Sequence, residues 1–301
     1  MTDPLVTVIF PCYNAHQYLG VALDSVFAQT YQKIEIIIVN DGSTDSKTLE
    51  FLSSLNSSVN VVHQENKGLP SARNRGFTEA QGKFVLPLDC DDWLEPSAIE
   101  QLLKAVKVGG ESVFAFPQMI LEDQGAGTTV KHYNGFEQLF LNQLPYCLLL
   151  PKNAWKKIGG YDESMRQGYE DWEFNIRLIK NGWRAVTVPK PLFHYRITES
   201  GMLLSTSGRQ HCELWKTIRK KHSEIYHFHE LKNTWSEWRK NPSSYPLWFY
   251  FIWLLVNSIV PTAWCSKVFS WARGYSNSRR VTRAYRKGNV EVVERPSRAQ
   301  P

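Results

Sequence analysis

The chain has 301 residues, 43% of them hydrophobic and 21% charged, which is a globular composition with room for one large domain or one domain and an appendage. Its five cysteines contain no CxxC pair, which argues against a disulfide framework or a structural zinc site and favours reduced thiols in the cytoplasm. The net charge of +6 is concentrated in Lys267–Arg298, where nine Lys or Arg face two Glu, a balance suited to an anionic partner. No secretory signal precedes the first apolar run, so we expect a cytoplasmic location.

The first third of the chain alternates between short apolar runs and segments with helical spacing. The apolar runs predict strands at Val6–Phe10, Glu35–Val39, Asn60–His63 and Phe84–Leu88. The spaced segments predict helices at Gln17–Gln29, Ser46–Leu55, Ser71–Ala80 and Pro96–Val108. Strands that alternate with helices of this length favour a parallel sheet covered on both faces, so we predict an α/β fold of Rossmann-like type.

Polar residues follow each predicted strand directly. They form the segments Pro11–Asn14, Asn40–Ser43, Gln64–Gly68 and Asp89–Asp92. Ligands of open α/β sheets bind beyond the carboxyl ends of the strands, so these segments predict a site at one rim of the sheet. The GxGxxG pattern is absent, and a dinucleotide cofactor is therefore not indicated.

The pattern after residue 112 is mixed, apart from three segments. Gly168–Ile179 has helical spacing, and His211–Arg239 is helical in pattern, basic and rich in aromatic residues. Asn241–Ser266 contains no charged residue. Its apolar core, Leu247–Val260, is shorter than the roughly 20 residues of a spanning helix.

Basic residues flank this uncharged stretch on both sides, and the positive-inside rule would place both flanks on the cytoplasmic side. We therefore favour an interfacial or re-entrant membrane segment at 245–265. The alternative is a buried helix that contacts the catalytic part or a second subunit. Nucleic acid is not an expected partner, because the aromatic residues cluster in an uncharged run instead of interleaving with the basic ones.

Three carboxylates, those of Asp89, Asp91 and Asp92, fall within four residues after a predicted strand. They repel one another unless a cation lies among them, and such oxygen ligands suit Mg²⁺ or Mn²⁺, which often share their coordination shell with substrate phosphates. Alternatively, Asp91 or Asp92 caps the helix predicted near Pro96.

Three further acidic residues have two readings each. Asp41 can accept hydrogen bonds from a uracil N3–H or a ribose hydroxyl, but Asp41–Asp45 is also good turn sequence. Glu170 and Asp171 can supply a general base to an attacking hydroxyl, but acidic residues also favour a helix N-terminus. The residues alone leave both alternatives open.

Six segments, taken together and in order, resemble family 2 glycosyltransferases of the GT-A fold. They are Val6–Tyr31, Glu35–Asp45, Asn66–Gly76, Gly82–Trp93, Gly159–Glu163 and Glu170–Leu178. The resemblance implies a mixed α/β sheet flanked by helices and an inverting transfer from a nucleoside-diphosphate sugar, most often a UDP-sugar. It covers about residues 5–200, so we expect a catalytic domain at 1–205 and a helical, aromatic and basic C-terminal region at 206–301.

The resemblance also implies roles for residues of the donor site. It places Pro11, Tyr13 and Asp41 around the base and ribose of the nucleotide. Arg73 and Asn74 fall where the family commonly lines the donor pocket.

The same resemblance implies that the acidic segment Asp89–Asp92 binds the metal and the donor. Asp91 becomes the ligand of a divalent metal, Mn²⁺ or Mg²⁺, with Asp92 nearby and Asp89 directed toward the donor ribose or sugar. His194 falls where some relatives use a residue to reach the metal or the diphosphate, although a lone histidine is more often structural.

The resemblance makes Asp171 the candidate catalytic base, with Glu170 beside it. The sequence departs from the family in two places. Asn40 replaces an acidic residue that often precedes the position of Asp41, and the Gln/Arg-x-x-Arg-Trp signature of processive synthases is missing after Asp171. Addition of a single sugar is therefore preferred over processive polymerisation.

Two other functions fit part of the pattern. A sugar nucleotidyltransferase would need a glycine-rich phosphate loop, whereas Phe10–Gly20 holds one glycine. A non-catalytic protein that binds nucleotide sugars would keep only the donor site. The expected acceptor is a saccharide or a lipid-linked molecule, and a membrane-facing C-terminal region favours a lipid-linked or surface-polysaccharide precursor at the cytoplasmic face of the membrane.

Overall fold

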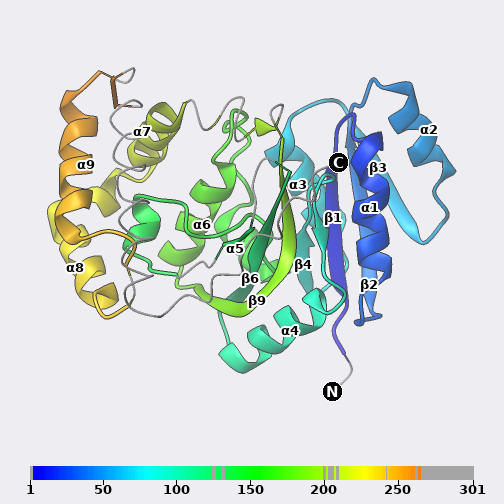
Figure 1. Ribbon diagram of the computed structural model, residues 1–301, viewed down its shortest axis with the longest axis horizontal. Coiled ribbons are helices and arrows are strands. Elements are labelled where there is room, and N and C mark those ends of the chain that lie inside the picture. Colours follow the sequence, from blue (N-terminus) through cyan, green and yellow to red (C-terminus); the bar gives the residue numbers. More distant parts are fainter. Residues whose placement is uncertain are drawn as a thin grey trace, which may run out of the picture. The chain divides into compact units, whose positions relative to one another are not determined.

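The computed structural model describes residues 3–123, 127–129, 133–198, 201–202, 207, 210–241, 243–261 and 264–265. It separates into two units, Met1–Ser244 and Tyr245–Pro301 (Figure 1). Both sheets belong to the first unit, and the second contains α9 (Leu247–Ile259). The functional boundary expected after residue 205 stays a prediction.

A five-stranded sheet with the order β3-β2-β1-β4-β8 forms the centre of the first unit. Its strands are β1 (Val6–Cys12), β2 (Ile34–Asp41), β3 (Val59–Gln64), β4 (Phe84–Pro87) and β8 (Leu150–Pro151). The first four pair in parallel, as the alternation of strands and helices predicts, and β8 pairs antiparallel with β4. The α/β class is therefore confirmed, and β8 makes the sheet mixed.

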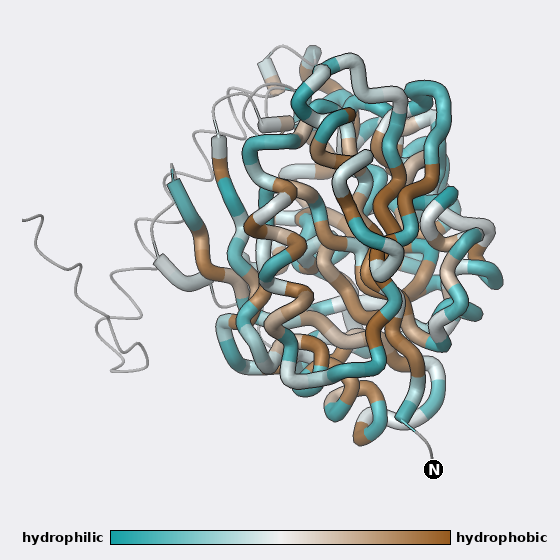
Figure 2. The backbone as a smooth tube through the Cα atoms, turned by 90° about the vertical axis from the view of Figure 1, so that its right-hand side faces the viewer, coloured by the Kyte–Doolittle hydropathy of each residue, from teal (hydrophilic) through white to brown (hydrophobic). Residues whose placement is uncertain are grey.

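Helices follow the parallel strands and cover both faces of this sheet. They are α1 (His16–Phe27), α2 (Ser46–Ser54), α3 (Leu69–Glu79) and α4 (Ala98–Gly109). Because side chains alternate along a strand, β1 contributes to two separate cores. Phe10 packs in the core that contains Leu23 of α1, and Ile9 packs in the core that contains Phe77 of α3. Figure 2 shows hydrophobic stretches inside this unit and hydrophilic stretches on its outer loops.

A second, four-stranded sheet has the order β5-β9-β6-β7. Its strands are β5 (Trp93–Leu94), β6 (Val113–Asp123), β7 (Gly127–Thr129) and β9 (Arg184–Ile197). The strand β5 follows the acidic segment Asp89–Asp92 directly and pairs antiparallel with β9. This pairing brings the C-terminal part of β9 beside the rim where the sequence predicts a site.

Further helices of the first unit follow among the described residues, and two of them contact the segment near residue 138. These further helices are α5 (Lys152–Ile158), α6 (Glu170–Lys180), α7 (His211–Lys221) and α8 (Phe228–Trp238), with the 3-10 helices η1 (Glu137–Leu139) and η3 (Ser223–Tyr226). The indole of Trp172 donates to the carbonyl of Gln138 at 2.6 Å, and the indole of Trp215 donates to that of Leu139 at 3.0 Å. The helix predicted at Gly168–Ile179 is confirmed as α6.

The helix α9 has 13 residues and begins after Pro246. Within the part of the chain that the structure describes, no helix combines the length and the hydropathy that crossing a membrane requires. The basic segment from Lys267 onward lies outside the described residues.

Candidate active site

A buried guanidinium lies at the centre of the candidate site. Arg73 on α3 is 1% exposed, donates from Nη1 to Glu170 Oε1 at 2.7 Å, and donates from Nη2 to both oxygens of Asp89 at 2.8 and 3.0 Å. Its guanidinium carbon lies 4.8 Å from the ring centroid of Tyr146 and 5.6 Å from that of Tyr161. Arg73 therefore joins three elements: α3, the segment after β4, and the start of α6.

The placement of α3 explains how Arg73 reaches the strand ends. The helix begins after Gly68, which has a φ of +90°, a conformation that glycine adopts without strain. Gly76 faces β1 so closely that an added Cβ would lie 2.3 Å from Cγ2 of Ile9. The small residue thus lets the helix lie directly on the sheet.

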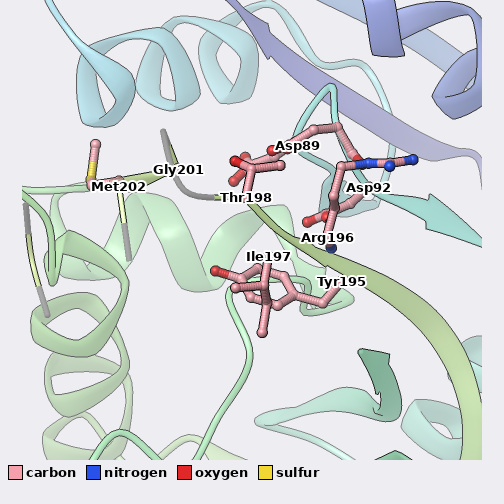
Figure 3. Close-up of a pocket in the computed structure, with 9 residues that line it drawn as sticks. Asp89, Asp92, Tyr195, Arg196, Ile197, Thr198, Gly201 and Met202 are labelled. Carbon is pink, nitrogen blue, oxygen red and sulfur yellow. The ribbon is translucent and has the colours of Figure 1, made fainter. Parts of the chain in front are cut away.

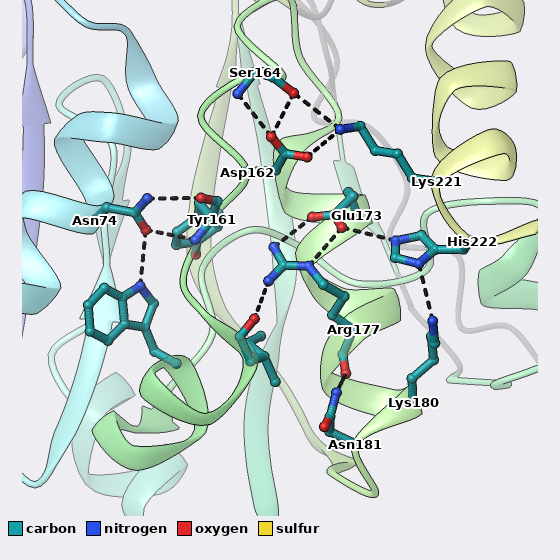
Figure 4. Close-up of polar contacts among 12 residues, drawn as sticks. Asn74, Tyr161, Asp162, Ser164, Glu173, Arg177, Lys180, Asn181, Lys221 and His222 are labelled. Atoms are coloured by element: carbon teal, nitrogen blue, oxygen red, sulfur yellow. Dashed lines mark hydrogen bonds and ion pairs between the residues drawn. The ribbon is translucent and has the colours of Figure 1, made fainter.

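Asn74, the neighbour of Arg73, fixes the aromatic ring beside the guanidinium (Figure 4). Its Oδ1 accepts from the indole of Trp155 at 3.1 Å and from the backbone N–H of Tyr161 at 2.7 Å, and its Nδ2 donates to the carbonyl of Tyr161 at 2.9 Å. The second N–H of Nδ2 donates to Oε1 of Glu163 at 2.9 Å, so these bonds use the whole amide of Asn74. In this structure Asn74 therefore acts by holding the segment that carries Tyr161.

The acidic segment after β4 is fixed by residues from two distant parts of the chain. The hydroxyl of Tyr146 donates to Oδ2 of Asp92 and accepts the backbone N–H of Asp89 at 3.0 Å. The backbone N–H of Arg196 donates to Oδ1 of Asp92 at 2.7 Å, and its Nε donates to the carbonyl of Asp91 at 3.0 Å. Asp92 is 1% exposed, so its carboxylate serves to hold the segment in place. The alternative role as a helix cap is wrong for Asp91 and Asp92, because α4 begins at Ala98.

A pocket of about 140 Å³ opens beside this segment (Figure 3). Its lining consists of the acidic residues and the end of β9 with the residues that follow, namely Asp89, Asp91, Asp92, Tyr195, Arg196, Ile197, Thr198, Gly201 and Met202. Burial and the neighbouring charge of Asp89 raise the pKa of Asp91 to about 6. A carboxylate desolvated in this way gains from a cation in the pocket.

The acidic residues at the pocket suit a divalent ion that takes only part of its ligands from the protein. Among the described residues, no three His, Cys, Asp or Glu side chains converge as a complete ligand set. Mg²⁺ commonly binds through one or two carboxylates and completes its shell with substrate phosphates and water. Asp91, as a residue of the pocket lining, is suited to that mode of binding.

Two acidic residues open α6. Glu170 is paired with Arg73, and Oδ2 of Asp171 accepts from Nδ2 of Asn142 at 2.8 Å. Burial raises the pKa of Glu170 to about 7 against the attraction of Arg73, and burial also raises the pKa of Asp171. Both residues lie in the first turn of the helix, where acidic side chains are favourably placed. Their chemical role stays a prediction.

The helix α6 is anchored by a second polar cluster (Figure 4). Glu173 accepts from Nε and Nη2 of Arg177 at 2.7 Å each and from Nε2 of His222 at 2.9 Å. Burial alone would raise the pKa of Glu173, but the hydrogen bonds from His222 and Arg177 outweigh it and lower the pKa. Nη1 of Arg177 also donates to the carbonyl of Ile158 at 2.6 Å. These contacts tie α6 to the end of α5 and to the residue that follows α7.

Asp41 ends β2 and is 3% exposed. Its Oδ1 accepts from Nε2 of Gln64 at 2.7 Å and from the backbone N–H of Lys67 at 2.8 Å, and its Oδ2 accepts from the backbone N–H of Gly68 at 2.8 Å. Asp41 therefore holds the loop that leads into α3. The local turn at this strand end is made by Asn40, whose Oδ1 accepts the backbone N–H of Ser43 at 2.9 Å.

The other two predicted nucleotide contacts lie at the end of β1. Tyr13 is 51% exposed, and Pro11 pairs in register with Val39 of β2. The carbonyl of Pro11 accepts from the thiol of Cys90 at 3.3 Å, which ties β1 to the acidic segment. Contact of Pro11, Tyr13 and Asp41 with a nucleotide stays a prediction.

The environment of His194 differs from the one a metal ligand needs. Its Nδ1 lies 2.8 Å from Oε1 of Glu122 and its Nε2 lies 2.8 Å from Oε1 of Glu95. The ring also stacks on Trp93 with the centroids 4.7 Å apart. Because both ring nitrogens contact carboxylates, a metal could bind His194 only after one of these contacts breaks. Of the three residues predicted to bind metal, Asp91 fits best.

The structure adds three residues that the sequence analysis does not identify: Asn142, Tyr146 and Arg196. Each contacts an acidic residue that the sequence does identify. Arg196 lies two positions after His194, so the sequence points to this segment of β9 but to a different residue in it. Asn142 and Tyr146 have no local signal, because neither belongs to a motif.

Solved structures of similar fold and related sequences are known. S. aureus TarS 1–349 in complex with UDP-GlcNAc is similar to the chain with a TM-score of 0.62 and 19% identity, covering 95% of this chain and 93% of that one. The same protein in complex with UDP gives a TM-score of 0.58 with 20% identity over 95% of this chain and 93% of that one.

Two bacterial glycosyltransferases are similar in sequence. The glycosyltransferase GlyA of Streptococcus pneumoniae serotype 4 is 32% identical over 222 residues, which is 67% of this chain and 32% of the relative. The putative glycosyltransferase EpsH of Bacillus subtilis is 31% identical over 225 residues, which is 67% of this chain and 64% of the relative. The match thus spans about a third of one relative and just under two thirds of the other. The family model described as "Glycosyl transferase family 2" matches residues 7–179. With a GT-A fold and a family match over most of its first unit, the chain belongs to glycosyl transferase family 2.

Proposed function

We propose that this chain transfers a sugar from a nucleoside-diphosphate sugar to an acceptor hydroxyl, with inversion at the anomeric carbon. The observation that carries the proposal is the cluster around Arg73, which joins Asp89, a residue of the pocket lining, to Glu170, the neighbour of Asp171. Complexes of a protein of similar fold with UDP-GlcNAc and with UDP support a UDP-sugar as the donor. The family match supports sugar transfer over nucleotidyl transfer.

The reaction requires stabilisation of the leaving diphosphate and removal of a proton from the attacking hydroxyl. Negative charge grows on the diphosphate oxygen as its bond to the anomeric carbon breaks, and the attacking hydroxyl must lose its proton. A divalent ion at Asp91, Mn²⁺ or Mg²⁺, would supply Lewis-acid stabilisation of the leaving diphosphate. General-base help of the kind proposed for Asp171 typically contributes about 10²–10⁴-fold in rate.

The contacts favour Asp171 over Glu170 as the base. The charge of Glu170 is committed to the guanidinium of Arg73 at 2.7 Å. Asp171 instead accepts from the neutral amide of Asn142, and an ionised carboxylate has about four acceptor positions. Asp171 therefore keeps the capacity to accept the proton of an acceptor hydroxyl, and Glu170 orients Arg73.

A nucleotide-sugar screen with matched aspartate variants tests this proposal. The measurement is release of free nucleotide, with and without Mn²⁺, by the wild type, Asp91→Asn and Asp171→Asn. We expect Asp171→Asn to lower turnover by about 10²-fold or more while calorimetry shows unchanged binding of UDP with Mn²⁺. Asp91→Asn should lose the metal-dependent part of that binding.

Asp162→Asn is the control, because Asp162 pairs with Lys221 and lies outside the cluster around Arg73. Its turnover should stay close to that of the wild type. Binding of donors without release of nucleotide from any of them would identify a non-catalytic binding protein. An Asp171→Asn variant that loses donor binding but keeps turnover would remove Asp171 from the base role.

We further propose that the second unit lies on the cytoplasmic face of a membrane and that the acceptor is a saccharide or a lipid-linked molecule of cell-surface polysaccharide or glycolipid synthesis. Four apolar side chains of α9 recur every three or four positions and are 51 to 71% exposed: Trp248, Ile252, Leu255 and Ile259. Residues at this spacing share one helix face. The sequence continues with seven Lys or Arg between Lys267 and Lys287, a charge suited to anionic lipid.

A further inference from the structure

A chain of three amide hydrogen bonds leads from the backbone near η1 to the proposed base. The backbone N–H of Gln143 donates to Oε1 of Gln138 at 2.8 Å, and Nε2 of Gln138 donates to Oδ1 of Asn142 at 3.1 Å. Nδ2 of Asn142 then donates to Oδ2 of Asp171 at 2.8 Å. The chain therefore ends on one oxygen of a half-buried carboxylate.

The first bond sets the direction of the other two. A backbone N–H can only donate, so the atom of Gln138 that faces it must be the carbonyl oxygen. The amide nitrogen of Gln138 then faces Asn142 and requires an oxygen there, which turns the nitrogen of Asn142 toward Asp171. Reversing either amide would place two donors or two acceptors against each other. The direction is thus determined by the network and needs no assignment of an ambiguous amide.

A hydrogen-bond donor at this position stabilises the ionised form of Asp171 more than the protonated form. An ionised carboxylate only accepts hydrogen bonds, whereas a protonated carboxyl must also place its own O–H. Hydrogen bonds to the charged form favour that form. The network therefore favours the ionised carboxylate, which is the form that a general base needs.

The start of the network is rigid. Gln138 is 0% exposed, its backbone N–H donates to the carbonyl of Asn134 at 2.9 Å, and its carbonyl accepts from the indole of Trp172 at 2.6 Å. Trp172 directly follows Asp171 on α6. The segment that carries Gln138 therefore contacts α6 at two successive residues, once through Asn142 and once through Trp172, and this fixes the helix start relative to the amide donor.

The other charged and titratable groups around Asp171 act in both directions. Burial raises its pKa, the guanidinium of Arg73 on α3 and the hydrogen bond from the backbone N–H of Trp172 lower it, and the charge of Asp89 raises it. The neighbouring Glu170 and the phenols of Tyr161 and Tyr195 also interact with the charge of Asp171. Since Arg73 is shared with Glu170 and Asp89, Asn142 is a donor directed at Asp171 alone.

We propose that Asn142, oriented by Gln138, is the positioning residue that holds Asp171 ionised and aimed for proton removal; this inference rests on the proposed function. Asn142 does not react itself. Its effect should appear in the pH dependence of transfer and leave donor binding unchanged.

The experiment compares pH profiles of kcat/KM for the wild type, Asn142→Ala and Asn142→Asp. Asp171 must be deprotonated to act, so activity falls as the pH drops through its pKa. Loss of the donor should move this acidic limb upward by about one pH unit, which lowers turnover on that limb about tenfold. Asn142→Asp adds a like charge and should move the limb further. The KM for the donor should not change.

Asn181→Ala is the matched control, because Asn181 ends the same helix and its amide bonds only to the carbonyl of Arg177 among the described residues. An acidic limb that stays in place in both Asn142 variants, or an equal loss of kcat at every pH, would overturn the proposal. A second measurement does not require turnover. Infrared titration of ¹³C-carboxyl-labelled aspartates, with Asp171→Asn as the reference, reads the protonation of Asp171 directly.

The titration should show a higher midpoint in Asn142→Ala than in the wild type. An unchanged midpoint would overturn the inference even if the wild type is active. A shifted midpoint in a protein that transfers no sugar would uphold the inference about Asp171 and refute the proposed function. The two failures are therefore distinguishable.

Discussion

Single side chains at this site make several contacts at once, and Tyr146 is the clearest case. Its hydroxyl donates to Asp92 and accepts the backbone N–H of Asp89, while its ring lies against the guanidinium of Arg73. Burial raises the pKa of Tyr146, so the hydroxyl keeps its proton and remains a donor. One residue thus supports both ends of the acidic segment.

Tyr146→Phe keeps the ring and removes the hydroxyl. The buried carboxylate of Asp92 would lose one of its two hydrogen-bond donors and the N–H of Asp89 would lose its acceptor, so we expect a destabilisation of about 1–3 kcal/mol. Donor binding should weaken as the acidic segment loosens. Thermal denaturation measures the first effect and calorimetry with UDP and Mn²⁺ the second.

The control is Tyr133→Phe, which removes a buried hydroxyl that has no partner among the described residues. That change should be neutral or slightly stabilising. Equal losses of stability in the two variants would show that the hydroxyl of Tyr146 has no special role.

The residues of the candidate site could be predicted from the sequence only where they belong to a recognisable motif. The resemblance named Arg73, Asp89, Glu170 and Asp171, and the structure gathers them into one cluster. Both Asp91 and Asp92 line the pocket, and the resemblance could not reveal that both carboxylate oxygens of Asp92 already accept hydrogen bonds. These bonds depend on Tyr146 and Arg196, which lie 54 and 104 positions away from Asp92, and no local pattern reveals such partners.

At the scale of elements, periodicity predicts the first half of the fold well and β9 poorly. The strands β1, β2 and β4 are mainly apolar, β3 holds three valines, and all four alternate with helices of regular spacing. In β9, Pro189 and Pro191 break the pattern, and proline normally argues against an inner strand. The structure accommodates them with register shifts opposite Pro117 and Gln118 of β6. A strand interrupted in this way is recognisable only from its partner.

The close packing of α3 on β1 gives a test at this scale. Gly76→Ala would place a methyl group 2.3 Å from Cγ2 of Ile9, so α3 must shift and carry Arg73 with it. We expect a destabilisation of about 1–3 kcal/mol from overpacking, together with a marked loss of activity. Urea denaturation and the nucleotide-release assay measure these changes.

Gly20→Ala is the comparison, because a Cβ on this residue of α1 would meet Phe51 at 4.0 Å, an ordinary contact. Alanine is the better helix former by about 1 kcal/mol, so this variant should be as stable as the wild type or more stable. A Gly76→Ala protein with full stability and activity would contradict the proposed packing constraint on Arg73.

At the scale of the whole molecule, the apolar face of α9 should bind to anionic vesicles. We expect the full chain to sediment with vesicles that contain phosphatidylserine at low salt, and less so at high salt, because the basic residues contribute through screened electrostatics. The double variant Trp248→Ala with Ile252→Ala should remain in the supernatant and keep its nucleotide-release activity.

Phe228→Ala removes an aromatic side chain of α8 that is 73% exposed. It is the control for nonspecific adsorption of exposed apolar side chains to the vesicles. It should sediment like the wild type. A wild-type protein that stays in the supernatant at low salt would refute the membrane proposal without affecting the assignment of the sugar-transfer site.

The long reach of the contacts around the acidic segment has a consequence for synthesis on the ribosome. The donor that Arg196 supplies to Asp92 is 104 positions away along the chain, and the pairing of Arg73 with Glu170 spans 97. The parallel strands β1, β2 and β4 can associate as soon as they emerge, whereas Asp92 must stay hydrated until β9 has been translated. During translation these contacts can therefore form only after α6 and β9 have been made, later than the first contacts among the parallel strands.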